Sequence, residues 1–543
     1  MRDSNPWVVW AGTTLLSVAM VGASGAPARA VEDTPQDTPA WAVLAPADGE
    51  TLLRQKCAAC HDQRDDGTYV RIDDGRRTPE GWDMTVVRMM RDHTVTMTAT
   101  ERRTLVRHLA DTRGLSLAET EGYRYILERT PVAWDEGPSA LMTEMCGRCH
   151  SYARVALQRR TPEDWEKLLH FHLGQYPTAE YQALARDRDW WGIAQTEVLD
   201  YLAATYPMGD APAAADIDPS GTWRVVGHQR GRGGYAGIMT VTLADDALLA
   251  LTLDLTFADG ATVSQTGRGL VYGAGEWRAA LSSDGTSLRQ VMALSGDGTA
   301  LTGRWFETDR DVIGGALTAV RTDAAARVLS ITPSHVRRGE SARVTIAGVG
   351  LSGATDLGDG MSATVVAASP ETVVLDITAA ADATPGARAV SVGDEALADA
   401  FVVYDSVARV EVVPAVTFAR VGGNAGPIPK VPAQFEAVGY MAGPDGAAGT
   451  DDDIRIGIMA ADWRTDNFDA TAAALEDARF AGHIDPSGLF EPGPAGPNPM
   501  RVMGTNNVGN LAVTASVTDG DRTVEGSGQL YVTVQRFIDP PIR

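Results

Sequence analysis

The chain contains two copies of one pentapeptide, Cys57-Ala-Ala-Cys60-His61 and Cys146-Gly-Arg-Cys149-His150. C-x-x-C-H is the attachment signature of c-type haem, in which two thiols add to the porphyrin vinyl groups and the adjacent His binds the iron. The two copies use all four cysteines of the 543 residues. A zinc site or a redox dithiol would not need a His after each pair. The sequence therefore predicts two covalently bound haem c groups. The attaching residues are Cys57, Cys60, Cys146 and Cys149, and the proximal iron ligands are His61 and His150.

A second similarity follows each haem motif. The first copy continues with Arg77-Thr-Pro-Glu-Gly-Trp82 and the second with Arg160-Thr-Pro-Glu-Asp-Trp165. Thr as N-cap, Pro at the first helical position and Glu near the positive end of the dipole predict a helix start in each. Each copy ends in a helical pattern, over residues 104–112 and 197–205. These last helices lie further from the tryptophan in the second copy than in the first. We therefore expect a ten-residue insertion in the second copy, around residues 183–191.

The repeat also indicates the second axial ligands, which in c-type haem are usually Met or His. Seven residues after the tryptophan of each copy stand Met89 and His172. This spacing is two helical turns along the same face. We predict Met89 as distal ligand of the first haem and His172 of the second, with Met90 and His93 as alternatives to Met89. Because Met raises the reduction potential and a second His lowers it, the two haems would differ in potential.

After a linker rich in Pro, Ala and Asp over residues 207–219, the pattern changes to short alternating apolar runs separated by Gly and Asp turns. The expected fold is multidomain: an N-terminal all-α tandem dihaem cytochrome c domain followed by three all-β domains, an antiparallel barrel and then immunoglobulin-like sandwiches. The expected boundaries are 1–30 for a signal peptide, 31–118 and 119–210 for the two cytochrome c units, 211–324 for the barrel, 325–405 for the first sandwich and 406–543 for the C-terminal domain.

Two segments of the C-terminal domain have distinct compositions. Residues 481–504 are loop-rich, and we expect them to cover a neighbour or a partner and not to form part of a core. Residues 445–453 (DGAAGTDDD) include Asp451 and could bind calcium through their carboxylates. They lack the EF-hand spacing and its closing Glu, so a solvated turn is favoured.

The N-terminus has the features of a secretory signal. Arg2 precedes an apolar run over residues 7–21, and Ala28-Arg29-Ala30 fits a cleavage site before Val31. The run is shorter than the roughly 20 residues of a membrane-spanning helix. We therefore expect export to the periplasm. The formal net charge of −24 argues against nucleic acid or an anionic membrane as a partner.

The haem motifs, the R-T-P-E-[GD]-W repeats, the stretch FHLGQYP with YQALARDRDWWG over residues 171–192, and the three β domains together resemble the α subunit of quinohaemoprotein amine dehydrogenase. The resemblance implies a heterotrimer with a β-propeller subunit and a small γ subunit. The γ subunit carries cysteine tryptophylquinone, at which primary amines are oxidised to aldehyde and ammonia. This chain would pass the electrons through its two haems to a soluble periplasmic copper protein or cytochrome c.

No catalytic residue is expected in this chain. Every Cys lies in a haem motif, so none is free for a tryptophylquinone crosslink, and no hydrolase, zinc-protease or nucleotide-binding motif is present. Two functions from other classes remain as alternatives. One is a freestanding dihaem electron carrier with β binding domains. The other is a dihaem peroxidase-like enzyme, in which one haem iron must be open to substrate.

Overall fold

The computed structural model describes residues 48–131, 135–174, 187–244, 248–423 and 428–535, together with Gln182 and Leu184. The predicted signal peptide and its cleavage site lie outside these residues. So do much of the predicted insertion and part of the stretch 171–192. Within the described ranges, no helix is long and apolar enough to cross a membrane.

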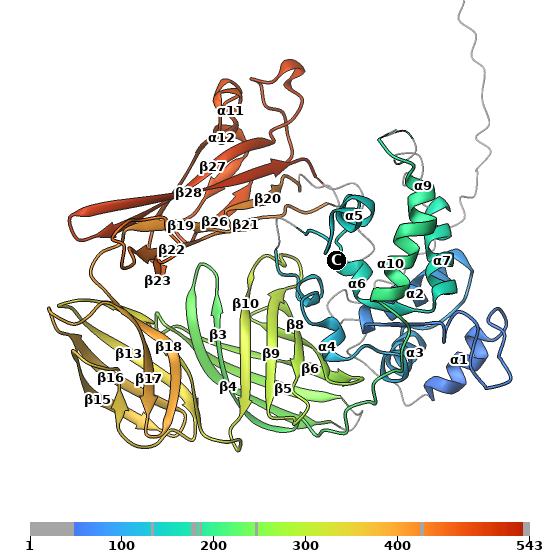
Figure 1. Ribbon diagram of the computed structural model, residues 1–543, viewed down its shortest axis with the longest axis horizontal. Helices are drawn as coiled ribbons and strands as arrows, with labels where there is room; N and C mark the ends of the chain where they lie inside the picture. The colour runs from blue at the N-terminus through green and yellow to red at the C-terminus, as the bar shows by residue number, and fades with distance from the viewer. Residues whose placement is uncertain are drawn as a thin grey trace, which may run out of the picture. The chain divides into compact units, whose positions relative to one another are not determined.

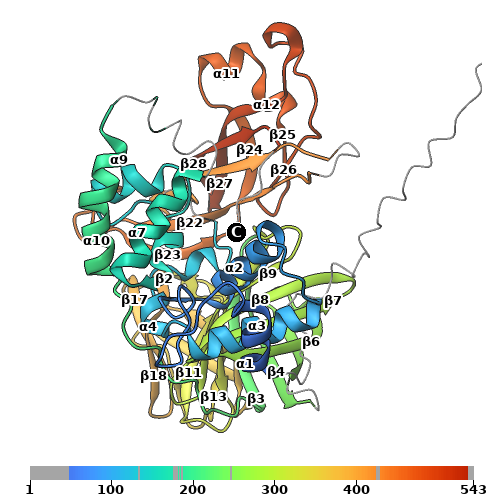
Figure 2. The same ribbon diagram turned by 90° about the vertical axis from the view of Figure 1, so that its right-hand side faces the viewer.

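The N-terminal region is helical and consists of two copies of similar structure (Figures 1 and 2). The first copy contains α1 (Gly49–Cys57), β1 (Gly75–Arg77), α2 (Pro79–Asp92) and α3 (Ala99–Thr112), and α4 (Leu117–Thr120) lies at the boundary. The second contains the 3-10 turn η1 (Arg124–Ile126), α5 (Ala140–Met142), η2 (Thr143–Gly147), α6 (Ala153–Ala156), β2 (Gln158–Arg160), α7 (Pro162–Phe171), η3 (His172–Gly174), α9 (Trp190–Ile193), η4 (Ala194–Val198) and α10 (Leu199–Thr205). Each copy has its own buried cluster, one around Trp82 and one around Trp165.

The predicted helix starts and the repeat are confirmed. Thr78 caps α2 by accepting a hydrogen bond from the N–H of Gly81, and Thr161 caps α7 in the same way. The indole of Trp82 donates to the carbonyl of Arg113 at 2.9 Å, just after the last turn of α3. The indole of Trp165 donates to Tyr206 at 3.1 Å, just after α10. Each tryptophan therefore ties the first helix of its repeat to the end of the last one.

The two copies meet at residues that are equivalent in the repeat. Strands β1 and β2 pair antiparallel, and Arg76 is opposite Arg159, which holds the same position in the second copy. The guanidinium of Arg88 lies over the ring of Phe171, again its equivalent in the second copy, at 5.0 Å from the ring centroid. Contacts between equivalent residues indicate that a local twofold axis relates the two copies and passes close to both contacts. The ribbon of β1 and β2 also corrects the expectation of an all-α region. Strands of three residues without an apolar side chain show no alternation of apolar and polar residues, so the sequence did not indicate them.

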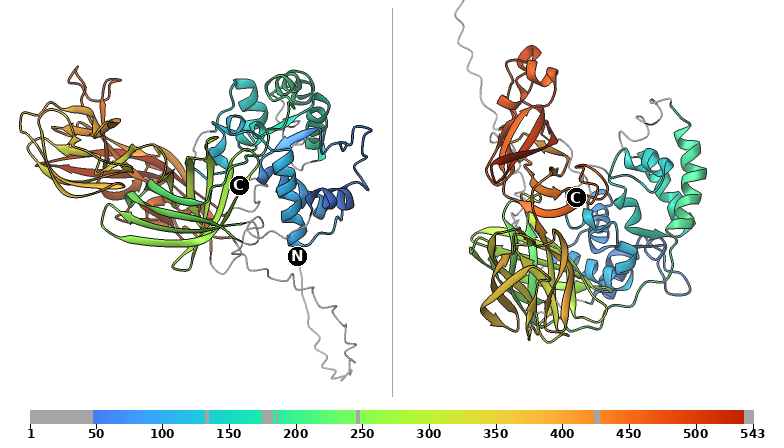
Figure 3. Two further views of the ribbon diagram at one scale, coloured as in Figure 1. Left: turned by 90° about the horizontal axis from the view of Figure 1, so that it is seen from below. Right: turned by 60° about the vertical axis from the view of Figure 1, so that its left-hand side comes forward.

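The next domain is a closed barrel in which all neighbouring strands pair antiparallel, as predicted (Figure 3). Its strands are β3 (Gly221–Gln229), β4 (Gly233–Leu243), β5 (Leu249–Phe257), β6 (Thr262–Tyr272), β7 (Glu276–Ser283), β8 (Thr286–Leu294), β9 (Ala300–Glu307) and β10 (Gly314–Arg321). Alternate residues point inward, and side chains such as Trp223, Trp277 and Met292 fill the interior. The barrel therefore has a packed core.

A buried ionic junction joins the barrel to the helical region. The guanidinium of Arg278, on β7, has Nε 2.6 Å from Oε1 of Glu80 and Nη2 2.8 Å from Oε2 of Glu276. Arg124 of the helical region binds the other oxygen of Glu276 at 2.7 Å. Glu80 is the second residue of α2, so the junction fixes the helix that follows the first haem motif.

The third domain has two four-stranded sheets around one core that includes Val344, Leu375 and Phe401. One sheet has the order β11-β13-β16-β15 and the other β12-β18-β17-β14. The strands are β11 (Arg327–Thr332), β12 (His335–Arg337), β13 (Ser341–Val349), β14 (Thr355–Asp356), β15 (Met361–Ser369), β16 (Thr372–Ala379), β17 (Gly386–Val392) and β18 (Glu395–Tyr404).

The C-terminal domain is more elaborate than the two-sheet sandwich expected from the sequence. Its sheets have the orders β19-β22-β23, β20-β28-β27-β24 and β21-β26-β25. The elements are β19 (Arg409–Val413), β20 (Val416–Arg420), β21 (Ala433–Gln434), β22 (Glu436–Met441), β23 (Ile454–Met459), β24 (Asp462–Asn467), α11 (Ala470–Ala474), α12 (Asp477–Phe480), β25 (Gly482–Ile484), β26 (Leu489–Pro492), η5 (Val502–Gly504), β27 (Gly509–Asp519) and β28 (Arg522–Thr533).

The expectation that residues 481–504 stay outside the core is wrong for the first part of the segment, whereas Met500, Val502 and Met503 near its end are exposed at 46%, 86% and 94%. Ala481 and Phe490 are fully buried members of the domain's main core cluster. The segment also forms β25 and β26, which pair with each other. Because Gly and Pro are frequent in this segment, the sequence pattern did not indicate its two short strands, whose few apolar side chains pack into the core.

Candidate haem-binding sites

The first haem motif follows directly from α1. The N–H groups of Cys60 and His61 donate to the carbonyl of Cys57 at 3.1 and 3.0 Å, so the motif is one tight turn at the end of the helix. Cys57 is half-buried and Cys60 is exposed. Burial, with a smaller effect from Cys60, raises the pKa of the Cys57 thiol to about 11. Both thiols are free and lie on one turn, which suits addition to two vinyl groups of one porphyrin.

The second motif has the same local form. Cys146 belongs to η2, and the N–H of Cys149 donates to its carbonyl at 3.4 Å. Burial raises the pKa of the Cys146 thiol to about 12. Gln182 directs its side-chain amide toward the sulfur of Cys149 at 3.9 Å. Both motifs thus present one half-buried and one exposed thiol.

The two motif histidines are oriented as iron ligands require. Nδ1 of His61 lies 2.9 Å from the carbonyl of Val70, and Nδ1 of His150 lies 2.9 Å from that of Ser151. A carbonyl only accepts, so Nδ1 carries the proton and the Nε2 lone pair is left for a metal. Burial lowers the pKa of His150 to about 4, which keeps this ring neutral. The residues of both motifs therefore fit a covalently bound haem.

His172 lies beside the second site. It caps the C-terminus of α7, and its Nδ1 donates to the carbonyl of Leu168 at 2.8 Å, which again leaves Nε2 free. Burial lowers the pKa of His172, and a charge on His172 would lower the pKa of His150 further. The two imidazoles therefore lie within electrostatic range of each other. His170, two residues earlier, instead packs edge-on against Trp191, with ring centroids 5.0 Å apart.

The first site has more than one thioether near it. Met89 is half-buried on α2, and its carbonyl accepts from the N–H of His93. Met90 and Met97 pack against the cluster around Trp82, as does Cys57. His93 is exposed at the end of α2. The structure thus brings two further methionines to the core on which the first motif lies, and Met97 stands in the loop before α3, outside the helical repeat that pointed to Met89.

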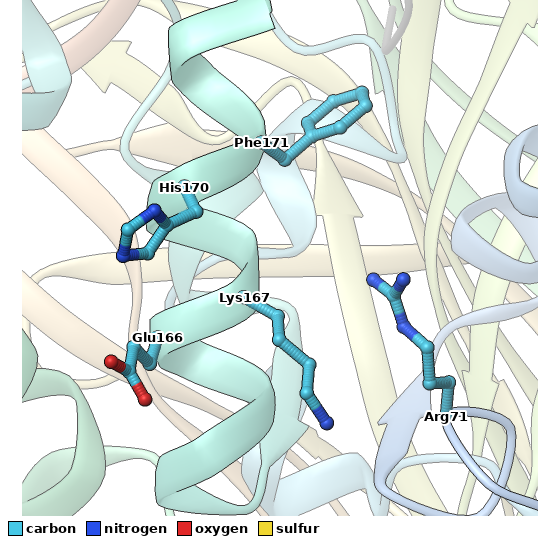
Figure 4. Close-up of a pocket in the computed structure, with 5 residues that line it drawn as sticks. All are labelled: Arg71, Glu166, Lys167, His170 and Phe171. Carbon is cyan, nitrogen blue, oxygen red and sulfur yellow. The ribbon is translucent and has the colours of Figure 1, made fainter.

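A cavity of about 420 Å³ lies between the loop after the first haem motif and α7. Figure 4 shows Lys167 and Phe171 pointing from α7 toward the side on which Arg71 lies, with Glu166 and His170 on the other side. The cavity is therefore lined by Arg71, which follows Val70, whose carbonyl holds His61, and by Phe171, which precedes His172.

The acidic loop of the C-terminal domain uses its carboxylates internally. Asp445 accepts from the N–H of Ala447 at 2.8 Å, and Asp453 accepts from Gly449 at 2.9 Å and pairs with Arg409 at 3.0 Å. Over the ranges that the structure covers, no group of three or more His, Cys, Asp or Glu residues could hold a metal ion. The loop is a hydrogen-bonded turn.

The fold and these sites define a multidomain haem-binding protein, in which a helical region with two C-x-x-C-H motifs precedes three β domains. Four family models match the chain: "Quinohemoprotein amine dehydrogenase A, alpha subunit, haem binding" over residues 47–212, and domains II, III and IV of the same alpha subunit over 217–322, 325–405 and 410–542. The chain belongs to the family of quinohaemoprotein amine dehydrogenase α subunits.

Two of the similar solved structures each cover part of the chain. A de novo designed fluorescence-activating β-barrel is 19% identical and covers 19% of this chain and 92% of its own, with a TM-score of 0.16. The first three extracellular domains of mouse clustered protocadherin PcdhgC3 are 12% identical and cover 44% of this chain and 77% of their own, with a TM-score of 0.16. No curated protein matches the chain significantly.

Proposed function

We propose that this chain is the dihaem electron-transfer subunit of a periplasmic quinohaemoprotein amine dehydrogenase. The observation that carries the proposal is the geometry of the two motif histidines. Each directs Nδ1 to a backbone carbonyl and leaves Nε2 free, one turn from two free thiols. Both motifs lie in the region matched by the family's haem-binding model. When bound, haem c supplies reversible one-electron reduction at iron.

Each residue of the sites has a defined part in this proposal. Cys57, Cys60, Cys146 and Cys149 hold the two porphyrins through thioether bonds, His61 and His150 bind the irons, and Met89 and His172 are the distal ligands. The proximity of His172 to His150 supports the second distal assignment. Met90, which packs against the same core cluster as Cys57, is the strongest competitor of Met89. A Met ligand on one iron and a His on the other would give the electrons a downhill direction.

The partner subunits follow from the family. Primary amines would be oxidised to aldehyde and ammonia at cysteine tryptophylquinone on a small subunit, which assembles with this chain and a β-propeller subunit. This chain would accept the electrons and deliver them to a soluble copper protein or cytochrome c. Its four cysteines all lie in haem motifs, which supports placing the quinone elsewhere. The predicted N-terminal signal supports a periplasmic location.

The test is purification of the complex from the native host, with haem and quinone staining of the separated subunits. We expect haem stain on this chain, quinone stain on a small chain, and rapid reduction of the haem absorption on addition of a primary amine. As a control, the double variant Cys146→Ser/Cys149→Ser should retain one haem and lose the other.

The alternatives predict different results. A haem chain that purifies alone and is not reduced by amines in the presence of the native extract would support the freestanding carrier. A high-spin haem in the resting protein would support the peroxidase-like enzyme, because that activity needs an open iron position.

A further inference from the structure

Arginines gather where the two copies of the helical region meet, in a chain whose formal net charge is −24. We call this set the arginine strip. It consists of Arg71, Arg76, Arg77, Arg88, Arg154, Arg159 and Arg160. Three pairs in it hold equivalent positions of the repeat, in the same alignment that matches the two tryptophans: Arg71 with Arg154, Arg76 with Arg159, and Arg77 with Arg160. The strip therefore follows the local twofold axis.

Some members of the strip are neutralised within the chain. Glu119 binds Arg76 through both oxygens, at 2.7 and 3.0 Å, and also lies 3.1 Å from Nε of Arg159. Asp164 forms an ion pair with Arg160 and lies 4.0 Å from Arg71. These two carboxylates serve four of the arginines. The three remaining arginines, Arg77, Arg88 and Arg154, form no ion pair with either of these carboxylates.

Arg77 is unpaired because of one difference between the repeats. The second copy has Asp164 in the first turn of α7, where it binds Arg160, but the first copy has Gly81 at that position. Arg77 is only 8% exposed, and its buried Nη1 has no hydrogen-bond partner among the described residues. Its guanidinium lies over the ring of Trp82, 4.6 Å from the centroid. Trp82 belongs to the core cluster against which Cys57 also packs, so this buried cation lies beside the core of the first haem motif.

At the second site the arginine without an ion pair among the described residues is Arg154, whose equivalent in the first copy is Arg71 and not Arg77. Arg154 lies four residues after His150, and its charge is one of the causes that lower the pKa of both His150 and His172, after burial. Its own pKa is lowered by burial and then by the charge of Arg88. In the part of the chain that the structure describes, neither Arg154 nor Arg88 forms an ion pair with a carboxylate.

Arg88 lies between the two sites. It is adjacent to Met89 on α2, and it lies over Phe171, which is adjacent to His172. Asp92, the acidic residue that acts on it, is held by Arg91 at 2.6 and 2.9 Å. Unpaired charges removed from water are costly, and the charge of Arg88 acts on both Arg77 and Arg154. Anions beside these guanidinium groups would stabilise the arrangement.

We propose that Arg77, Arg88 and Arg154 bind the haem propionates: Arg77 those of the first haem, Arg154 those of the second, and Arg88 between them. The inference rests on the proposed haem attachment. Propionates are the only carboxylates of a porphyrin that is tethered at its vinyl groups, and guanidinium binds carboxylate through two parallel hydrogen bonds. Because the strip lies where the two copies meet and Arg88 acts on both Arg77 and Arg154, the propionate edges of both haems would face one shared cationic site. That arrangement gives electrons a short path between the haems.

The test uses the full chain, loaded with haem in a host that attaches haem c, without the partner subunits. The variants are Arg77→Gln, Arg154→Gln and their Lys counterparts. Arg343→Gln is the matched control, because Arg343 forms an exposed ion pair with Asp376 at 2.7 Å in the third domain. The two readouts are the midpoint potential of each haem and the propionate bending bands in the resonance Raman spectrum.

Each Gln variant should lower the ratio of reduced to oxidised haem at fixed potential by about tenfold, which is about 59 mV for one electron. Loss of a positive charge beside the haem disfavours the reduced form. Arg77→Gln should affect the first haem and Arg154→Gln the second, and each should shift the propionate bands of that haem. The Lys variants, which keep the positive charge, should have midpoint potentials close to those of the wild-type chain. Arg343→Gln should change neither the midpoint potentials nor the propionate bands.

Loaded Gln variants with unchanged potentials and unchanged propionate bands would overturn the inference and leave the proposed function intact. If a variant fails to load, an experimental structure of the loaded wild-type chain decides. Guanidinium nitrogens of Arg77 and Arg154 within hydrogen-bond distance of propionate oxygens support the inference, and propionates directed elsewhere overturn it. A wild-type chain that carries no haem would instead contradict the proposed function.

Discussion

Replacing Arg278 by Met should loosen the helical region from the barrel. The side chain of Arg278 is 2% exposed and forms ion pairs with Glu80 and Glu276. Removing one partner of a buried ion pair costs about 3–5 kcal/mol, because the remaining charge is left without compensation. Two features indicate that the loss of stability for Arg278→Met lies near the lower end of this range. Glu276 keeps Arg124 at 2.7 Å and the hydroxyl of Thr120 at 3.1 Å, and the side chain of Glu80 is 35% exposed and can be rehydrated. We therefore expect a loss of about 3 kcal/mol.

The assay is urea denaturation of the loaded chain, followed by helical circular dichroism and by the haem absorption. The control is Arg343→Met, in which an equally long side chain is removed from an exposed pair with Asp376 and no measurable change is expected. The double variant Arg278→Met/Glu80→Gln should recover part of the loss, because it removes the charge that the single variant leaves unpaired. A single variant no less stable than the control would refute the ionic junction as the element that fixes α2.

Three further predictions follow from the sites and the cores. His172→Ala should turn the second haem from low-spin to high-spin in the visible spectrum and leave the first unchanged; two low-spin haems in the variant would exclude His172 as a ligand. Phe490→Ala should cost about 3–5 kcal/mol in urea denaturation because Phe490 is fully buried, whereas Phe418→Ala, at a side chain 42% exposed, should cost clearly less; equal losses would contradict the core position of Phe490. Burial raises the pKa of Glu119, but hydrogen bonds from Arg76 and from the backbone N–H of Ser116, the N-cap of α4, outweigh it and lower this pKa below its usual value. The stabilisation by Glu119 is therefore present above about pH 4.5 and is lost as pH falls through the lower folded pKa. Glu119→Gln should therefore be less stable at neutral pH and lose less on acidification, and a variant with the wild-type pH profile would contradict this role.

The features that sequence predicted best are those set by local chemistry. The two C-x-x-C-H turns, the Thr-Pro-Glu helix starts and the tryptophans that close each repeat all depend on residues within a few positions of one another or on a repeated pattern. The barrel was predicted from alternating strands and turns, and its inward-facing residues follow that alternation.

The features that sequence did not predict depend on contacts distant along the chain. Arg278 meets Glu80 across 198 residues, and nothing in either local sequence indicates the other. The pairing of β1 with β2 involves three residues on each side, all polar except Gly75, and arises from the meeting of two repeats. The choice among Met89, Met90 and Met97 depends on how α2 and the loop before α3 pack against the core. The spacing within the repeat indicates only which face of α2 is directed to the haem, not which methionine binds the iron.

The most direct test of the central claim is the intact mass of the exported chain, measured after denaturation to remove anything bound without a covalent link. The account predicts the mass of the processed polypeptide plus two haem groups, with none of the four thiols available to a sulfhydryl reagent. A mass equal to the bare polypeptide, with Cys57, Cys60, Cys146 and Cys149 all reactive, would contradict it.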